Sequence, residues 1–192
     1  MSATAPHSPF VYETDYNGRI VWVNEAWNRF AAENAAEHLQ EERVLGRRLW
    51  DFISDPETQQ IYHLLMKKVM DEGRSLRFPF RCDAPSLRRY LDMEMTSPQQ
   101  QVCRFRSVVV KLEARSEVSL WKPTAKRTDR FLRACSWCKK VDAGQESWQE
   151  VEDALRELEL FNRSRLPQLT HTICPSCYTS MQGVLQSDST KG

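Results

Sequence analysis

The sequence predicts an α+β protein: a five-stranded antiparallel sheet with flanking helices, followed by a small helical module stapled by a metal ion. Three observations lead to this prediction. Segments of alternating apolar and polar residues, two before a long helical stretch and three after it, have the period of half-buried strands. Strands, then helices, then strands are typical of α+β folds with an antiparallel sheet. Two Cys-x-x-Cys pairs lie near the C-terminus.

Composition narrows the class of protein. The chain has 192 residues and a formal net charge of +1, so no global field favours nucleic acid or a membrane surface. No apolar run approaches the roughly 20 residues that span a bilayer, and residues 1–10 lack the pattern of a secretory signal. We therefore expect a cytosolic protein with no membrane contact, whose cysteines stay reduced rather than form a disulfide framework.

The first strands form a hairpin. Residues 1–8 are polar and small, and we expect a disordered lead. In "FVYETDYNGRIVWVN", Asn17-Gly18 predicts a two-residue type I′ turn, because both residue types tolerate positive φ. A helical stretch, "EAWNRFAAENAAEHL", follows, and "GRRLWDFI" reads as a short irregular segment.

The longest helix is predicted in "SDPETQQIYHLLMKKVMDEG". Ser54 and Glu57 have the spacing of a capping box, Pro56 suits the first turn, and Gly73 suits the end. The spacing predicts a buried stripe made of Ile61, Leu64, Leu65 and Val69.

Three strands complete the sheet, in "LRFPFRC", "YLDMEMT" and "VCRFRSVVVKLEA", ending near Ala114. Pro79 lies in the first of them and cannot donate a ladder hydrogen bond, so this strand is predicted at an edge of the sheet.

Residues 9–114 resemble the PAS family. The hairpin "ETDYNGRIVWVNEAWNRF", Gly46 before "LWDFI", the long helix and the three strands carry this resemblance. It implies a sheet order of 2-1-5-4-3, in which the third strand is the edge that Pro79 also indicates. It further implies that the domain senses a small cue or mediates dimerisation. The loop "RCDAPSLRR" departs from the short turn that PAS domains often have between strands three and four.

Residues 115–133 are basic and are predicted to be a connector, either a solvated linker or a helix leaving the sheet. A phosphate-contacting patch is the alternative. Residues 134–183 form the second module, and residues 184–192 are expected to be a disordered tail. Within the module, "SWQEVEDALRELELF" predicts an amphipathic helix with a Ser147–Glu150 capping box and an acidic outer face.

Four cysteines, Cys135, Cys138, Cys174 and Cys177, form C-x-x-C…C-x-x-C. Two such turns supply the four thiolates of a tetrahedral structural zinc site. The gap between the pairs is longer than the common spacing, which is explained if the amphipathic helix is inserted there. His171 lies three residues before Cys174, so it is either an alternate ligand in a Cys₃His site or a second-shell donor.

Other cysteine chemistries are weighed against zinc. An iron–sulfur cluster also uses four cysteines. Thiol switching remains open, because Lys139 and Lys140 would lower a neighbouring thiol pKa. Covalent haem attachment needs a His directly after C-x-x-C, and Lys139 and Tyr178 occupy those positions.

The C-terminal segment has its own resemblance. "CSWCKKV…W…VEDAL…LTHTICPSC" is similar to a segment that follows PAS domains in some bacterial sensory proteins, including histidine kinases. This resemblance implies that the two parts form one unit in a signalling context.

The sequence does not identify a ligand of the PAS core. His63 lies on the long helix, where haem-binding PAS domains place a ligand, but it falls opposite the apolar stripe, so we expect a partly exposed side chain. "GRRLWDFI" lacks the Cys of flavin photosensors, and Cys82 and Cys103 are expected to pack as small apolar residues. No catalytic motif of a common hydrolase, kinase or nucleotide-binding enzyme is present.

These observations predict a non-enzymatic bacterial signalling protein that senses a small cue or dimerises and relays its state to a protein partner through the zinc-stapled module. Two alternatives remain. One is a nucleic-acid-associated regulator that uses the basic stretch 122–140, and the other is a sensor in which oxidised thiolates release zinc.

Overall fold

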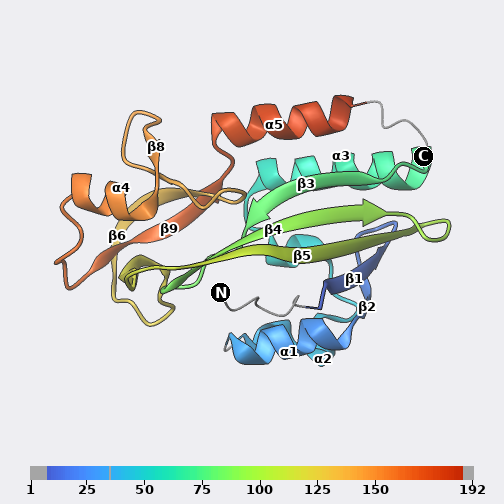
Figure 1. The fold of residues 1–192 in the computed structure, drawn as a ribbon, viewed down its shortest axis with the longest axis horizontal. Coiled ribbons are helices and arrows are strands. Elements are labelled where there is room, and N and C mark those ends of the chain that lie inside the picture. The colour runs from blue at the N-terminus through green and yellow to red at the C-terminus, as the bar shows by residue number, and fades with distance from the viewer. Residues whose placement is uncertain (1–7, 35, 188–192) are drawn as a thin grey trace, which may run out of the picture.

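The N-terminal unit is a five-stranded antiparallel sheet with helices packed against it (Figure 1). The structure, a computed structural model, describes residues 8–34 and 36–187. The strand order is β2-β1-β5-β4-β3, so the predicted order and the edge position of the Pro79 strand are confirmed. The strands are β1 (Phe10–Asp15), β2 (Ile20–Val23), β3 (Leu76–Arg81), β4 (Leu87–Thr96) and β5 (Val102–Ala114).

Helices bury the apolar residues of this sheet. They are α1 (Glu25–Glu33), α2 (Glu41–Val44) and α3 (Pro56–Glu72), with short 3-10 helices at Glu37–Leu39 and Leu49–Phe52. Leu65 of α3, Met95 of β4 and Phe105 of β5 are completely buried. The core therefore lies between α3 and the central strands.

The predictions for the turn of the first hairpin and for the N-cap of α3 are partly wrong. Only Gly18 of the predicted turn pair has a positive φ (76°), and its N–H donates to the carbonyl of Asp15 (3.0 Å). The Asp15 carboxylate also accepts from the N–H of Asn17 (2.9 Å), so a longer turn replaces the type I′ loop. In α3, Asp55 rather than Ser54 is the N-cap, because its carboxylate reaches the N–H groups of the first turn.

The apolar stripe of α3 also differs from the prediction at one position. Leu64 is exposed, whereas Met66 is buried with Ile61, Leu65 and Val69. Gly73 ends the helix in the left-handed conformation (φ 64°), as predicted.

The C-terminal unit contains a second sheet, so the prediction of a helical module is wrong in part. The order of this sheet is β8-β7-β6-β9, in which β6 and β9 are parallel and the other pairs are antiparallel. Its elements are β6 (Arg127–Cys135), β7 (Val141–Asp142), β8 (Trp148–Gln149), α4 (Val151–Glu157), β9 (Leu166–Thr172) and α5 (Pro175–Gln186).

Most of the segment expected to be a connector is folded into this unit. Val118, which precedes a 3-10 helix at Ser119–Trp121, and Leu120 within that helix are buried in a small core with Leu132 and Val151. The segment after it is strand β6, because a parallel partner, β9, is available only in the folded chain. The predicted helix near 147 is shorter than expected: Trp148 lies in β8, and Glu150 caps α4 without a side-chain hydrogen bond.

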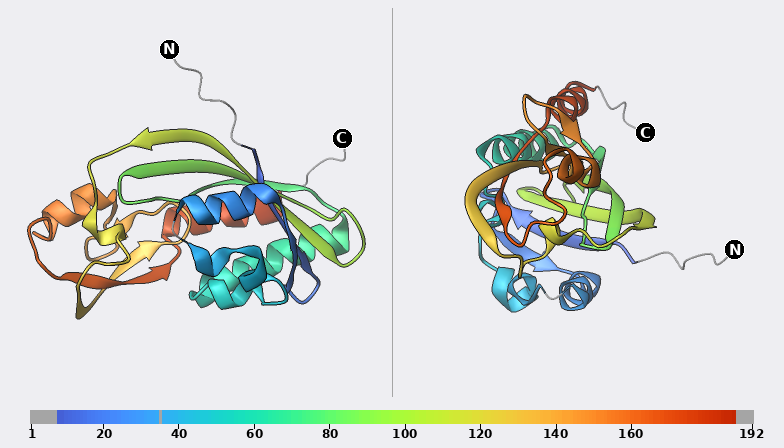
Figure 2. Two further views of the ribbon diagram at one scale, coloured as in Figure 1. Left: turned by 90° about the horizontal axis from the view of Figure 1, so that it is seen from below. Right: turned by 90° about the vertical axis from the view of Figure 1, so that its left-hand side faces the viewer.

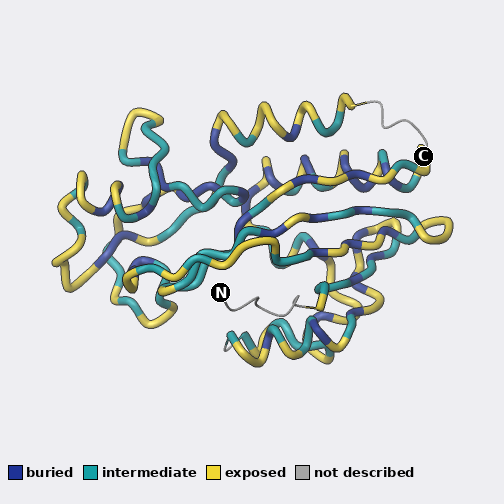
Figure 3. The backbone as a smooth tube through the Cα atoms, in the orientation of Figure 1, coloured by how far each residue is buried: buried dark blue, intermediate teal, exposed yellow. Residues whose placement is uncertain are grey.

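The two units share one core at their junction. Helix α5 lies alongside α3 (Figures 1 and 2), and the Lys68 ammonium on α3 donates to the carbonyl of Leu185 on α5. Buried positions continue from α3 and the strands into the segment that leads to α5 (Figure 3). The predicted lead and tail lie largely outside the described residues, although residues 184–186 of the expected tail belong to α5.

Candidate metal centre and adjoining cavity

Two backbone turns bring the four cysteines together. Cys135 ends β6, and the chain then turns so that the N–H of Lys139, which has a φ of 60°, donates to the carbonyl of Cys135 (3.1 Å). Cys174 is the N-cap of α5, and Cys177 lies in its first turn. Each pair is therefore held by the end of a regular element rather than by a free loop.

The sulfur atoms have the geometry of a four-thiolate site. The four Sγ atoms all lie within 4.8 Å of one another, and those of Cys138 and Cys174 are 3.8 Å apart. Bonds of about 2.3 Å in a tetrahedral zinc site place neighbouring sulfurs about 3.8 Å apart. All six cysteines are free, and the N–H of Cys174 points at the Sγ of Cys135 (3.4 Å). The residues present thus fit a zinc ion.

The electrostatics of the thiols point the same way. Hydrogen bonds from the Cys138 and Cys177 side chains lower the pKa of Cys135 far below its usual range. The resulting thiolate raises the pKa of Cys138 to about 12 and that of Cys177 further. Like charges this close do not ionise together unless a cation compensates them, so the cluster is suited to a dication.

His171 is not part of this sulfur group. It is exposed on β9, opposite Ala134 of β6, and it lines the cavity described below. Burial lowers its pKa, the charge of Lys139 lowers it further, and Asp55 raises it. The geometry therefore favours the Cys₄ set over the Cys₃His alternative.

Trp137 links the cysteine turn to the core of the N-terminal unit. It lies between Cys135 and Cys138, yet its side chain is 4% exposed. Its ring centroid lies 5.4 Å from that of Tyr62 on α3 and 6.1 Å from that of Phe78 on β3. Its carbonyl accepts from the N–H of Arg81 (2.8 Å) at the free edge of β3. The first Cys-x-x-Cys turn is thereby docked on the first domain by side chain and backbone.

An arginine–carboxylate network forms a second contact between the units. Arg81 contacts Asp83 (2.6 Å) and Glu150 (2.8 Å), and its side chain is 7% exposed. Arg88 contacts Glu152 (2.6 Å) in the first turn of α4. The network also includes Arg115 and Glu113. The Arg-rich loop that departs from the PAS pattern thus holds the acidic face of the C-terminal unit.

A cavity of about 450 Å³ lies beside this junction. Its walls come from the sheet, from α1, from the 3-10 helix at Leu49–Phe52 and from α3, and they are mainly apolar, with several aromatic side chains. Ser136, Lys139 and His171 of the C-terminal unit complete its lining. The cavity is therefore built by both units.

Part of the basic stretch 122–140 is engaged within the molecule. Lys122 pairs with Glu117 and Arg133 with Asp142, while Arg127 donates to three backbone carbonyls. The other four cations, Lys126, Arg130, Lys139 and Lys140, have no carboxylate at ion-pair distance among the described residues, so the nucleic-acid alternative stays open.

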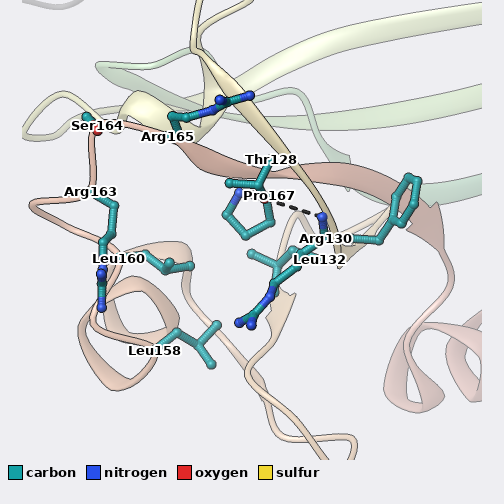
Figure 4. Close-up of a pocket in the computed structure, with 10 residues that line it drawn as sticks. Thr128, Arg130, Leu132, Leu158, Leu160, Arg163, Ser164, Arg165 and Pro167 are labelled. Carbon is teal, nitrogen blue, oxygen red and sulfur yellow. Dashed lines mark hydrogen bonds between the residues drawn. The ribbon is translucent and has the colours of Figure 1, made fainter.

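A separate groove of about 700 Å³ lies on the C-terminal unit (Figure 4). Leucines 158 and 160 and Pro167 form its apolar part, and Arg130, Arg163 and Arg165 are at its rim. Phe131, also part of its lining, is 66% exposed. No carboxylate lies within ion-pair distance of these three arginines in the described ranges.

The remaining candidates lie where the sequence suggested. His63 is exposed on α3 but packs against Trp50 in a tilted arrangement, with ring centroids 3.7 Å apart, and partial desolvation of the imidazole lowers its pKa. Cys103 is buried, and desolvation raises its pKa to about 12, so it behaves as an apolar side chain. Sequence reasoning missed Trp137 and Arg81, although a Trp between two metal ligands and an Arg facing away from an apolar stripe were the available signals.

Comparisons with known proteins agree with this architecture. Residues 7–104, about half of the chain, match the family described as the PAS fold. No curated protein matches the chain. Within residues 8–34 and 36–187, no helix is both long enough and apolar enough to span a membrane.

Three solved structures are similar over about half of the chain. The first is a domain of an HTR-like protein from Haloarcula marismortui, at 15% identity and a TM-score of 0.39, covering 54% of this chain and 98% of that one. The second is the PAS domain of Bordetella pertussis BvgS, at 14% identity and a TM-score of 0.41, covering 53% of this chain and 76% of that one. The third is the photoactive yellow protein domain of the sensor histidine kinase Ppr from Rhodospirillum centenum, at 17% identity and a TM-score of 0.38, covering 55% of this chain and 86% of that one.

Proposed function

We infer the function of this protein from one premise: over its N-terminal half, the chain belongs to the PAS fold family. We propose that it is a non-enzymatic cytosolic sensory module. A small cue or self-association acts on the PAS unit, and a C-terminal unit fastened by a Cys₄ zinc site passes the change to a protein partner.

The insertion of Trp137 into the PAS core carries this proposal. Trp137 lies between two of the four cysteines and packs on Tyr62 and Phe78, so a movement of α3 or β3 would displace the turn that carries Cys135 and Cys138. The reverse also holds, since loss of the metal would free the turn that places this side chain. A zinc ion held here by four thiolates supplies folding energy and keeps no open coordination position, which favours a structural over a catalytic role.

The contact with a partner is proposed at the arginine-rimmed groove. The acidic face of α4 is less available to a partner, because Glu150 and Glu152 already pair with arginines of the PAS unit. The groove combines an apolar floor, the exposed Phe131 and three arginines without carboxylate partners among the residues described. An acidic segment of a protein with apolar side chains has the complementary chemistry.

Metal content, measured by mass spectrometry on untagged protein purified without chelators, tests the proposal. We expect one zinc per chain, lost in Cys135→Ser and Cys174→Ser and retained in the matched variant His171→Ala. If the protein instead contains iron and absorbs visible light, the four cysteines hold an iron–sulfur cluster rather than zinc. Metal-free protein with reduced thiols would remove the metal from the proposal and favour a thiol redox sensor.

A further inference from the structure

The cavity between the two units has the chemistry of a specific ligand class. We propose that it binds a small aromatic carboxylic acid, whose ring lies among the aromatic walls and whose carboxylate lies at the Lys139 side. This inference rests on the proposed function, because it names the cue and the contact by which the C-terminal unit detects it.

The walls favour a flat, mainly apolar molecule. A volume of about 450 Å³ lies within the range of small-molecule sites. Seven of its lining side chains are aromatic ones from both the sheet and the helices: Phe10, Tyr12, Trp27, Phe30, Phe52, Tyr62 and Phe80. Aromatic rings pack favourably in offset or edge-to-face arrangements, so an aromatic ligand gains more here than an aliphatic one of equal size.

Hydroxyl groups on these walls favour an oxygen substituent on the ring. Tyr12 is 8% exposed and Tyr62 half-buried, and neither phenol has a hydrogen-bond partner in the described part of the chain. Among the described residues, the Ser107 hydroxyl contacts the sulfur of Met93, at 3.5 Å, which is a weak acceptor. A ligand that offers an oxygen acceptor would give these hydroxyl groups a stronger partner. Burial raises the pKa of both tyrosines, which keeps them neutral donors.

Lys139 is the candidate cation for the carboxylate, although burial lowers its pKa. Its Nζ donates to the carbonyl of Ser136 (2.7 Å), and it has no carboxylate at ion-pair distance among the described residues. The other cation of the lining, Arg81, is neutralised by Asp83 and Glu150. The Asp55 carboxylate is occupied at the N-terminus of α3 by the N–H groups of Glu57 and Thr58. Lys139 is thus the cation best placed to meet an anionic ligand.

This arrangement couples the ligand to the metal centre. Lys139 directly follows Cys138, and Trp137 of the same turn packs in the PAS core. A carboxylate held by Lys139 would tie the cysteine turn to the cavity wall. Binding would then stabilise the junction between the units without contacting the metal.

Calorimetric titration of the full zinc-loaded chain tests the inference. The probes are para-hydroxybenzoate, para-hydroxyphenylacetate and indole acetate, each beside its primary amide. We expect at least one acid to bind, and its amide to bind at least tenfold more weakly. A hydrogen bond to a charged group contributes about 1.5–3 kcal/mol, which corresponds to about 10- to 150-fold in affinity.

Two variants separate Lys139 from its neighbour. Lys139→Met keeps the length of the side chain, and we expect it to bind the acid as weakly as the amide. Lys140→Met, which changes a residue outside the cavity lining, should bind the acid like the wild type. Zinc content is measured in the same samples, because Lys139 also lies near the Cys135 and Cys138 thiols.

Equal binding of acid and amide by the wild type would overturn the inference, whatever the variants do. So would the absence of binding by every acid. Either result with one zinc per chain leaves the proposed metal-fastened module intact, whereas a chain without zinc contradicts that module separately from the ligand result.

Discussion

Replacing Trp137 by alanine tests whether the cysteine turn and the PAS core form one structural unit. The change removes a side chain that is 4% exposed and in contact with both α3 and β3. Trp137 is not a metal ligand, so the four sulfurs remain. The variant therefore disturbs the packing between the units without disturbing the chemistry of the site.

The expected loss of stability is large. A buried Trp removes about 150–250 Å² from water, or about 4–6 kcal/mol at about 25 cal/mol per Å². The indole N–H of Trp137 has no hydrogen-bond partner within the described part of the chain, which reduces this value because its desolvation is uncompensated. The measured range for Phe or Trp to Ala in cores is about 3–5 kcal/mol. For a chain of this size that corresponds to a fall in Tm of about 6–20 °C.

Urea denaturation of the zinc-loaded protein, followed by circular dichroism, measures this loss. The matched control is Trp22→Ala on the edge strand β2, where the side chain is 43% exposed and a change of about 0.5 kcal/mol is expected. Chelator competition on the same samples should show faster zinc removal from Trp137→Ala than from Trp22→Ala. Equal midpoints and equal zinc release for the two variants would refute the reasoning, because the turn would then not depend on the core.

Three further predictions follow from individual residues. Gly18→Ala should destabilise the protein by about 1–3 kcal/mol, because the φ of Gly18 is 76° and an added Cβ would lie 2.9 Å from the Trp50 ring. Gly183→Ala on α5 is the control: a Cβ there meets no atom within 4 Å, so the change should stabilise the protein by about 0.5–1 kcal/mol, and thermal melts of both variants check this. The pKa of His63, measured by NMR titration, should lie below 6.5 and rise in Trp50→Ala, and an unshifted pKa would contradict the role of the contact with Trp50. Because the folded-state pKa is lowered, the stability that His63 contributes is lost as the pH falls below about 6.5. Glu150→Gln should lower the free energy of unfolding by about 1–3 kcal/mol, because it removes the charge that pairs with the nearly buried Arg81, although the Glu150 side chain itself is 32% exposed. A urea midpoint equal to that of the wild type would show that the network does not hold the two units together.

Local signals in the sequence predicted the PAS unit well. Alternation located the strands, Pro79 identified the edge, and Gly73 identified the end of α3, because each depends on backbone chemistry that acts over a few residues. The errors there are also local. Asp55 outcompeted Ser54 as the cap because its carboxylate reaches two N–H groups of the first turn, and Met66 replaced Leu64 on the buried side.

The C-terminal unit was predicted less well, because its elements depend on partners far away in the chain. Residues 127–135 look like a basic linker until β9 pairs with them in parallel. The acidic residues at the start of α4 look solvated until Arg81 at the end of β3 and Arg88 at the start of β4 reach them. Neither the pairing nor the contact leaves a periodic pattern in the sequence.

The sequence by itself determined the succession of strands and helices along the N-terminal unit, the resemblance to the PAS family and the identity of the four candidate ligands, since residue type, spacing and short-range period define these. The order of the strands in the sheet was implied by that resemblance. Only the tertiary structure decided that the four sulfurs meet, that His171 points to a cavity instead of joining them, and that Trp137 joins the two units. The physical reason is that packing and ion pairing act between residues that are close in space, and the sequence separations involved here, such as 69 residues between Arg81 and Glu150, carry no local signal.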